Sequence, residues 1–462
     1  MKITRFAFLL VFILVLIICF PARAQLSDVN LSFITIQNIG VSEATVTVTF
    51  IGTDGTEYIP VNLGNGITNP FTLAPGVAQQ IVVSQIPSLP FGSYSVVISS
   101  DVEVVAEVGI AGSGAVRFTG AYTGLSSGAT TYYIPTISFN YFGWYGMLSV
   151  QNLGTDLADV TVSIICTGGS ATGTTATLSQ TDIPPQASYT WPLKNITPTG
   201  LNTDDSCDGS ATVVSNQPIV AVNTQNKPLS GETNTFEGSA EGSDTIYVGG
   251  LSNNYYGWYS ALTVQAVGPS IDTTVTVDYA GSQWTDDTCH LTDTAPSCKL
   301  IIQRIVETTG RYGATITSNN GTPLLAIVST TNITDYPVVR SNTVRGIAFG
   351  NNTFAVSNVA KAFYGWKTAI TCQNLGEIAT AIHFSYSGYE GDAYNTSVLQ
   401  PGESIQKVST YEAFLPDGYD GGATLTAVKA GASIACFAGN SNDIPPIPGD
   451  WTVAYNGFGY DR

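Results

Sequence analysis

The side chains that most often carry enzymatic or metal chemistry are scarce in this chain of 462 residues, which has only two histidines. His290 lies beside Cys289, and His383 alternates with Ile382 and Phe384, so we expect the His383 ring to face solvent. Histidines placed in this way argue against a Ser-His-Asp triad and against a histidine-based zinc site. The sequence therefore predicts neither a catalytic centre nor a metal site of these kinds.

Carboxylates gather in three loops that are rich in Gly, Thr or Asn, and such loops offer oxygen atoms that Ca²⁺ could use. The three clusters are Asp204-Asp205, Asp286-Asp287, and Asp417 with Asp420. None has the spacing of an EF-hand loop, and solvated loop charge is the simpler interpretation. A glycosidase pair of carboxylates stays open, although nothing in the sequence marks a pair or a substrate cleft. We expect no enzyme activity and no cofactor, with Ca²⁺ binding as the alternative.

The strongest candidate for a binding site is an aromatic-Gly-Trp motif that occurs three times. Its copies begin and end at Tyr141 and Trp144, at Tyr255 and Trp258, and at Phe363 and Trp366. Exposed rings beside Asn and Tyr could stack on sugar rings. Alternatively, each Trp could plug the junction between neighbouring domains, with the Gly allowing close approach. Recurrence in every copy favours packing, because each domain would need the same plug, and a ligand platform is the alternative.

The motif marks an internal repeat, and such self-similarity decides the fold class. Trp144 and Trp258 are 114 residues apart, and Trp258 and Trp366 are 108 apart. A Gln-x-x-Gly turn follows each motif and also occurs at residues 37–40, so the chain holds four repeats. Apolar residues alternate with Ser and Thr around each turn, as they do over residues 46–50, which predicts half-buried strands.

The first 24 residues have the pattern of a cleaved signal peptide. Lys2 and Arg5 precede an apolar run over residues 6–20, and Ala22-Arg23-Ala24 is a small-x-small cleavage site. This run is short for a membrane span, which needs roughly 20 apolar residues. No other long apolar run occurs in the chain. We therefore expect a secreted protein that begins at Gln25 and has no membrane span after cleavage.

The charge balance limits the classes of partner. The chain has 34 acidic and 16 basic residues, a formal net charge of −18. This excess disfavours nucleic acid and anionic membranes as partners. Charged residues make up only 11% of the chain, against about a quarter in an average globular protein, so Ser, Thr, Asn and Gly must provide solubility. Such a surface is common in extracellular fibrous and adhesive proteins.

The cysteines after the signal peptide suggest a disulfide framework. One pair falls within each of the last three repeats, which favours the pairings Cys166–Cys207, Cys289–Cys298 and Cys372–Cys436. Because an exported chain meets an oxidising compartment, we expect these pairs to be disulfides, and the alternative is buried free thiols. The Cys372–Cys436 bond would link an opening strand to a closing strand across one domain.

Around seven short strands per repeat, with turn signals between them, are the pattern of an Ig-like β-sandwich. With the strand and turn at Ile36 to Gly40 and the Leu-x-Pro-Gly turn at Leu399 to Gly402, the chain resembles tandem Ig-like repeat proteins of the secreted bacterial cell-surface type. The resemblance covers nearly all of the chain after the signal peptide. It implies a role at the cell surface, in adhesion or in assembly, and brings no catalytic residues.

We therefore expect an all-β protein with four tandem Ig-like β-sandwich domains after a signal peptide. The expected boundaries are residues 1–24 for the signal peptide and 25–131, 132–245, 246–353 and 354–462 for the four repeats. The sequence favours a secreted structural or adhesive cell-surface protein, such as a subunit of an extracellular filament or coat. An array of carbohydrate-binding modules is the alternative. The expected partners are protein, including further copies of the chain, or glycans.

The two ends of the chain predict a mode of assembly. Extended leaders at residues 132–135, 246–249 and 354–356 open the last three repeats, but the equivalent segment of the first repeat falls inside the signal peptide. The first domain would then expose an unpaired strand edge. An aromatic C-terminal tail could add a strand to that edge in another copy and build head-to-tail filaments. The aromatic residues of this tail are Trp451, Tyr455, Phe458 and Tyr460. The alternative is that both ends are capped.

Overall fold

The computed structural model of the chain describes residues 30–112, 118–279, 284–332, 338–442, 449–450 and 452–460. The predicted signal peptide and Trp451 lie outside these residues. The described residues form an all-β fold, as the sequence predicts, with antiparallel strand pairs apart from one short parallel pair, β23 with β31. Across the same residues, no helix has the length and apolar character needed to cross a membrane.

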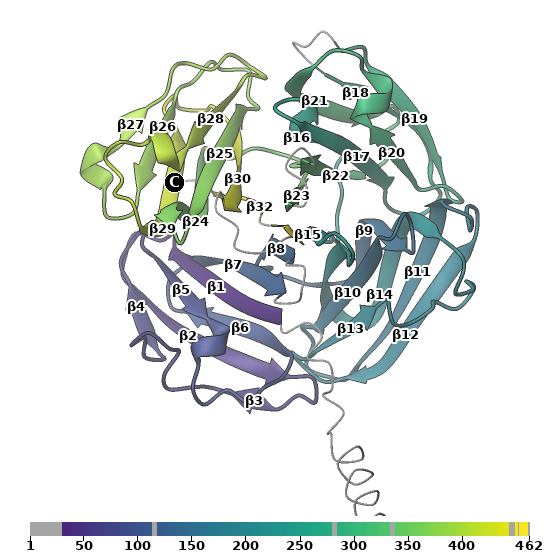
Figure 1. Ribbon diagram of the computed structural model, residues 1–462, viewed down its shortest axis with the longest axis horizontal. Helices are drawn as coiled ribbons and strands as arrows, with labels where there is room; N and C mark the ends of the chain where they lie inside the picture. The colour runs from purple at the N-terminus through teal and green to yellow at the C-terminus, as the bar shows by residue number, and fades with distance from the viewer. Residues whose placement is uncertain are drawn as a thin grey trace, which may run out of the picture.

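The strands fall into four groups that follow the four sequence repeats (Figure 1). The first group comprises β1 (Asn30–Asn38), β2 (Ala44–Gly52), β3 (Glu57–Tyr58), β4 (Phe71–Leu73), β5 (Ala78–Val82), η1 (Val83–Gln85), β6 (Tyr94–Ser100), β7 (Val104–Gly112) and β8 (Phe118–Thr123). The second comprises β9 (Ala129–Phe139), β10 (Tyr145–Asn152), β11 (Ala158–Gly168), β12 (Thr175–Ile183), β13 (Ser188–Pro192), β14 (Cys207–Lys227) and β15 (Glu232–Glu237).

The last two groups also contain short helical turns. The third comprises β16 (Thr245–Asn253), β17 (Trp258–Ala266), β18 (Asp272–Asp278), β19 (Asp287–Thr292), β20 (Ser297–Ile301), α2 (Ile302–Ile305), β21 (Gly310–Ser318), β22 (Leu324–Asn332) and β23 (Val338–Arg345). The fourth comprises β24 (Thr353–Phe363), β25 (Trp366–Asn374), β26 (Ile382–Tyr386), η2 (Glu390–Asp392), β27 (Tyr394–Asn395), β28 (Ser404–Val408), η3 (Ser409–Tyr411), β29 (Tyr419–Ala427), β30 (Ile434–Asn442), β31 (Gly449–Asp450), β32 (Thr452–Asn456) and β33 (Phe458–Tyr460).

Each group forms a two-layered sandwich around its own core. In the third group, one layer has the order β16-β21-β18-β19 and the other contains β20-β17-β22-β23. The alternation of the sequence explains the layers, because Val275 and Val277 of β18 are buried while their neighbours are more exposed. Four clusters of buried apolar side chains, one mainly from each repeat, mark the four cores. We keep the boundaries after residues 131, 245 and 353 as a proposal, since the cores divide close to them.

The strand order differs from that of an immunoglobulin domain, in which the first and second strands lie side by side in one sheet. In the third repeat, β16 and β17 lie in opposite layers, and so do β17 and β18. The opening strand β17 pairs instead with β20 and β22. The likeness to Ig domains is therefore one of two-layered architecture and not of strand order.

The four sandwiches close into a ring around a shared centre (Figure 1). The closing strands β8, β15, β23 and β32 lie there, and each contacts its two neighbours in that cyclic order. Equivalent residues of these strands meet: Thr119 Oγ1 donates to the Thr452 carbonyl at 3.1 Å, and the Arg345 amide donates to Asn456 Oδ1 at 3.1 Å. Because equivalent positions meet at both ends, the four closing strands run in the same direction, and a rotation relates the repeats.

Asp450 joins all four repeats at this centre. Its carboxylate is fully buried and accepts hydrogen bonds from the backbone amides of Thr233, Ser341 and Thr452 at 3.0–3.1 Å. Its carbonyl oxygen accepts a hydrogen bond from Thr119 Oγ1 at 3.3 Å. Burial raises the pKa of the Asp450 carboxyl well above its usual value, and the amide hydrogen bonds oppose this shift. The ring therefore depends on one buried polar residue near the C-terminus.

The aromatic C-terminal tail belongs to this centre. Tyr455 is buried, and its hydroxyl donates to the Asn358 carbonyl at 2.6 Å. Phe458 and Tyr460 lie in β33, which pairs with the leader strand β24 of the same repeat. Within one chain these residues thus pair with their own repeat, and strand donation to another copy stays a prediction. The leader strands β9, β16 and β24 of the last three repeats pair with β14, β21 and β29, respectively. The equivalent of these partner strands in the first repeat is β6, which pairs only with β2 among the described residues.

Candidate binding face

The three aromatic-Gly-Trp motifs are tight β-hairpin turns between each leader strand and the next strand. In the second repeat, Tyr141 and Trp144 exchange backbone hydrogen bonds of 3.2 and 2.9 Å. The two residues between them, Phe142 and Gly143, have φ values of +48° and +81°. Positive φ at both central residues defines the type I′ turn that suits the twist of a hairpin. The same geometry recurs at Tyr256 (φ +49°) with Gly257 (φ +78°) and at Tyr364 (φ +48°) with Gly365 (φ +85°).

An aromatic residue is a poor choice for the first central position of this turn, where Asn, Asp and Gly are preferred because their side chains tolerate positive φ. Phe142, Tyr256 and Tyr364 nevertheless occupy it, and their rings are 75%, 82% and 85% exposed. The turn geometry disfavours these rings, and they are not buried within the chain. We term them the tip aromatics, and their recurrence at an unfavourable position points to contact with a partner.

Each tip aromatic is held edge-to-face against the first aromatic residue of its motif, with ring centroids 4.7 Å apart in all three copies. This contact fixes the direction in which the exposed ring points. Trp144, Trp258 and Trp366 are partly buried beside the turns and belong to none of the four buried cores. Each Trp therefore stabilises a hairpin more than it fills a core.

Tyr141 of the second repeat reaches the neighbouring third repeat. Lys299 Nζ from the third repeat lies 5.9 Å from the centroid of the Tyr141 ring. The same ammonium group is 2.5 Å from Asp208 Oδ2 of the second repeat. Burial raises the pKa of Tyr141, with Asp208 adding to the shift and Arg304 opposing it. The base of this hairpin is thus part of the junction, while its tip is free to meet a partner.

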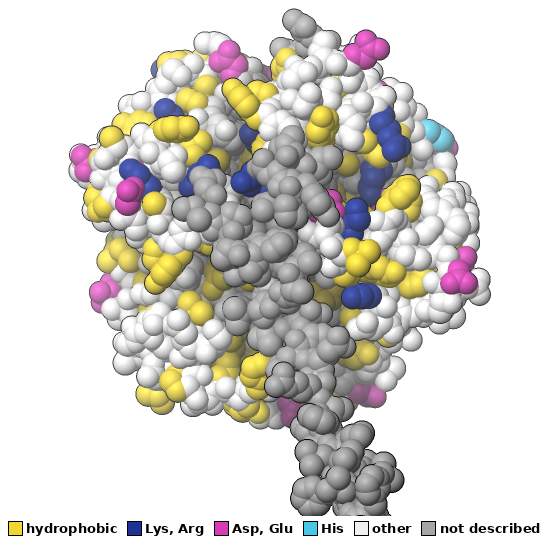
Figure 2. Space-filling view, in the orientation of Figure 1, with side chains coloured by type: hydrophobic (Ala, Val, Ile, Leu, Met, Phe, Trp, Pro, Cys, Tyr) yellow, Lys and Arg dark blue, Asp and Glu magenta, His cyan; other side chains and the backbone are white. Residues whose placement is uncertain are grey.

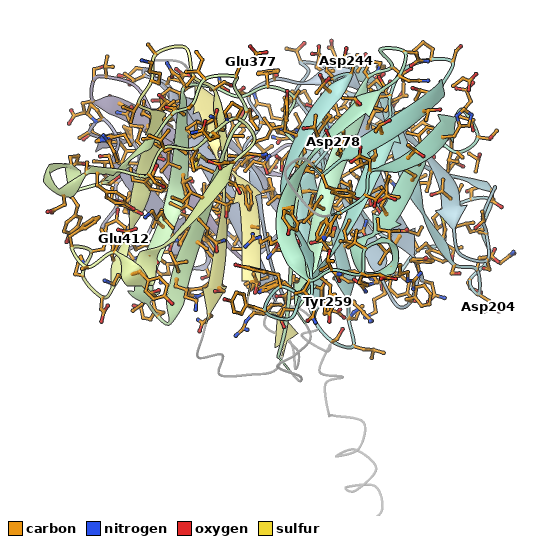
Figure 3. The ribbon with its side chains drawn as sticks, turned by 90° about the horizontal axis from the view of Figure 1, so that it is seen from above. Asp204, Asp244, Tyr259, Asp278, Glu377 and Glu412 are labelled. Carbon is orange, nitrogen blue, oxygen red and sulfur yellow. A yellow bond between two sulfur atoms is a disulfide. The ribbon has the colours of Figure 1, made fainter. Side chains whose placement is uncertain are left out.

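The three hairpins lie on one face of the ring, because a rotation relates the repeats. Tyr259, next to Trp258, lies at one edge of the side view, and Asp244 and Glu377 lie at the opposite edge (Figure 3). Figure 2 shows the hairpin face, on which Lys and Arg side chains lie mostly between centre and rim, and Asp and Glu mostly at the rim. This face combines apolar groups with positive charge in a chain whose net charge is −18.

Basic side chains also lie beside the hairpins in the chain. Lys227 ends the strand that pairs with β10 and forms an ion pair of 3.3 Å with Glu232. Lys361 and Lys367 are opposite each other at the base of the third hairpin. The buried Lys361 Nζ donates to the carbonyl of Leu415 at 2.7 Å. Lysine side chains therefore lie beside at least two of the three hairpins, although Lys227 is ion-paired and Lys361 is buried.

Each of the three disulfides links two strands within a single repeat. Cys166–Cys207, Cys289–Cys298 and Cys372–Cys436 are present, with Cα–Cα distances of 5.2, 6.6 and 4.1 Å. Cys372 and Cys436 are direct partners in the neighbouring strands β25 and β30, so this bond lies within one sheet and does not cross the domain. Cys289 and Cys298 instead join strands of the two layers, β19 and β20.

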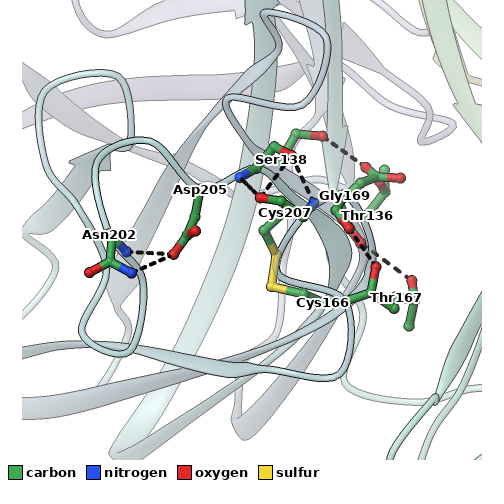
Figure 4. The surroundings of a disulfide bond; sticks show 12 residues. Thr136, Ser138, Cys166, Thr167, Gly169, Asn202, Asp205 and Cys207 are labelled. Carbon is green, nitrogen blue, oxygen red and sulfur yellow. Dashed lines mark hydrogen bonds between the residues drawn. A yellow bond between two sulfur atoms is a disulfide. The ribbon is translucent and has the colours of Figure 1, made fainter.

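Several side chains of the acidic loops, and both histidines, contact polar neighbours among the described residues. Asp205 accepts hydrogen bonds from the backbone and side chain of Asn202, beside the Cys166–Cys207 bond (Figure 4). Asp287 accepts one from the Tyr279 hydroxyl at 2.9 Å. His290 lies 3.3 Å from Asp272, and the His383 ring contacts Asn395. In the part of the chain that the structure describes, no three His, Cys, Asp or Glu side chains gather as metal ligands would.

A shallow cleft of about 390 Å³ lies in the fourth repeat. Its lining is Tyr394, Gln406, Lys407, Val408, Tyr411 and Glu412. The Glu412 carboxylate accepts the Tyr394 hydroxyl at 2.6 Å, and Lys407 lies over the Tyr394 ring at 5.4 Å. The carboxylate of the cleft, that of Glu412, already accepts a hydrogen bond. The cleft is therefore a weaker candidate for a functional site than the three hairpin tips.

The sequence singled out the first and last residues of each motif, but the tip aromatics lie between them. The signal that could have found them is an aromatic residue directly before Gly in a two-residue turn, since that position demands positive φ. This pattern occurs three times in the sequence, at Phe142-Gly143, Tyr256-Gly257 and Tyr364-Gly365.

Comparison with known proteins adds little to this geometry. No protein-family model matches the chain, and no curated protein matches it. Among solved structures, it is similar to the full-length major pilin RrgB from Streptococcus pneumoniae, with 8% sequence identity and a TM-score of 0.12 over 95% of this chain and 89% of the pilin. A TM-score this low carries no argument about fold or function.

Proposed function

We propose that this chain is an extracellular adhesive protein that attaches to a surface through its hairpin face. The observation that carries the proposal is the set of three tip aromatics, each exposed and each at a backbone position that disfavours it. Three disulfides suit an oxidising compartment outside the cell. Assembly through the C-terminal tail is not part of the proposal, because that tail lies within the ring.

Glycan is the ligand class that this face fits best, which brings the adhesive and the carbohydrate-binding interpretations together. Flat aromatic rings with a fixed orientation offer an apolar face for the C–H groups of a sugar. Lys and Arg side chains on the same face favour a glycan that carries carboxylate or sulfate groups. The rings stand apart on separate hairpins, so a polymer with repeated sugar units would meet several of them at once.

The test compares binding of the intact protein to immobilised neutral and acidic polysaccharides. The variant replaces all three tip aromatics, Phe142→Asn, Tyr256→Asn and Tyr364→Asn, because Asn suits the turn and should preserve the fold. Phe91→Asn is the matched control, since Phe91 is 92% exposed and lies outside the hairpins. We expect acidic polysaccharide to retain the native protein and the control but not the triple variant.

Two results would overturn the proposal. One is equal retention of the native protein and the triple variant on every polysaccharide that binds either. The other is retention of the native protein on anionic phospholipid vesicles but on no polysaccharide, which would assign the face to a membrane.

A further inference from the structure

The junction between the first and fourth repeats, which closes the ring, carries a buried acid where the equivalent positions are apolar. Glu107 of β7 pairs with Thr35 of β1. The strand register places Val222, Ile327 and Phe437 at the same position in the other repeats. Ile327 belongs to the core cluster of the second repeat, and Phe437 packs against that of the third, so this position faces the preceding repeat in the ring. Glu107 accordingly faces the fourth repeat.

The Glu107 side chain is fully buried, and neither carboxylate oxygen makes a hydrogen bond of normal geometry among the described residues, although the side chains of Asn358 and Ser357 lie beside it. An isolated buried carboxylate is strongly unfavourable unless a proton or a cation neutralises it. Burial raises the pKa of Glu107 well above its usual value, and the nearby Asp420 carboxylate adds to the shift. Ser357 and Asn358 of β24 lie close enough to oppose it.

Further buried oxygen atoms lie on both sides of this junction. Thr35 Oγ1, in the first repeat, and Ser357 Oγ, in the fourth, are both buried and have no hydrogen-bond partner among the described residues. Asp420 lies in β29, which pairs with the leader β24. Two carboxylates and two hydroxyl groups therefore meet where the ring closes, and none of the ion pairs between described residues includes either acid.

At the junction between the second and third repeats, a lysine neutralises the carboxylate that occupies the position equivalent to Asp420. Asp208 is opposite Ser138 in the second repeat, as Asp420 is opposite Ala360 in the fourth. Lys299 of the next repeat meets Asp208 at 2.5 Å. The first repeat has Gln80 at the position of Lys299, so it offers Asp420 no such ammonium group. The closing junction thus has an additional carboxylate and lacks the corresponding lysine.

We propose that a calcium ion binds at this junction, between the carboxylates of Glu107 and Asp420, with the hydroxyl groups of Thr35 and Ser357 as further oxygen ligands. Ca²⁺ takes six to eight oxygen ligands in flexible geometry, and water can complete such a shell. The ion supplies the positive charge that Lys299 supplies at the other junction. Because its ligands come from the first and fourth repeats, it locks the ring where these two repeats meet. Asp417, which the sequence groups with Asp420, is exposed and takes no part.

The test measures Ca²⁺ binding by isothermal titration calorimetry, and thermal unfolding in EDTA and in millimolar CaCl₂, on the intact protein. We expect one binding event and a melting temperature several degrees higher with Ca²⁺. Glu107→Gln should lose the heat of binding and the shift, and Asp417→Asn should keep both. Glu107→Ile introduces the residue found at the equivalent position of the third repeat. This variant should fold in EDTA, and Ca²⁺ should not change its melting temperature. It serves as the test if Glu107→Gln does not fold.

The proposal fails if the native protein gives no heat of binding and melts at the same temperature in EDTA and in CaCl₂. It also fails if folded Glu107→Gln or Glu107→Ile retains the full shift, because the ion would then bind elsewhere.

Discussion

Ser341 and Asp450 meet at the centre of the ring although 109 residues separate them, with the Ser341 amide 3.0 Å from one carboxylate oxygen of Asp450 and 3.1 Å from the other. This contact connects the third repeat to the last strands of the fourth. Because Asp450 also contacts Thr119 and Thr233, it makes the four sandwiches one closed unit.

Replacing Asp450 with Asn should loosen this centre. An amide has one acceptor oxygen in place of two, and its NH₂ group would face backbone amides that are themselves donors. We expect Asp450→Asn to lower the free energy of unfolding by about 2–4 kcal/mol, from unpaired buried donors, and to separate the unfolding of individual repeats. Urea unfolding followed by tryptophan fluorescence checks this, with the exposed Asp417→Asn as control. Unchanged, single-step unfolding would show that the Asp450 contacts do not couple the repeats.

The hairpin tips should be more stable without their aromatic residues. Tyr256 has a φ of +49° and is 82% exposed, so Tyr256→Asn relieves backbone strain and removes little packing. We expect a gain on the order of 1 kcal/mol, measured by chemical denaturation. Gly257→Ala should instead lose a similar amount, because the φ of Gly257 is +78°. A clear loss from Tyr256→Asn would mean that the ring supports the fold and does not need a partner to explain its place.

Removing the aromatic tail should harm the fold and not merely block assembly. Truncation after Asp450 deletes β32 and β33, with the buried Tyr455 and its hydrogen bond to Asn358. The loss of one large core side chain alone costs about 3–5 kcal/mol, so we expect the truncated protein to melt earlier and to aggregate. Light scattering and calorimetry make the comparison, with truncation after Tyr460 as control. A truncated protein as stable and monodisperse as the full chain would support the tail as a separable donor.

The sequence predicts local structure well because each repeat carries its own alternation of apolar residues. The buried Val46 and Val48 and the partly exposed Thr47 between them already indicate a half-buried strand. The three cysteine pairs also follow from the repeat, since each lies inside one unit. These features depend on neighbours in the chain or on a single domain.

Closure of the ring could not be predicted in this way. The hydrogen bond from Thr119 to the Thr452 carbonyl joins residues 333 positions apart, and it arises only when four sandwiches are rotated around one axis. The role of Glu107 is hidden for the same reason, because its counterparts Val222, Ile327 and Phe437 are identified from the strand register. The sequence alone does not identify the neighbours of Glu107 across the junction.

The most direct test of adhesion through the hairpin face counts the hairpins. Native protein, the three single variants Phe142→Asn, Tyr256→Asn and Tyr364→Asn, and the triple variant are passed over a sensor coated with the acidic polysaccharide that binds best. Because one rigid face engages a polymer at several points, each single change should weaken binding and the triple change should weaken it by roughly 100-fold or more. A folded triple variant with the native dissociation constant would contradict the account.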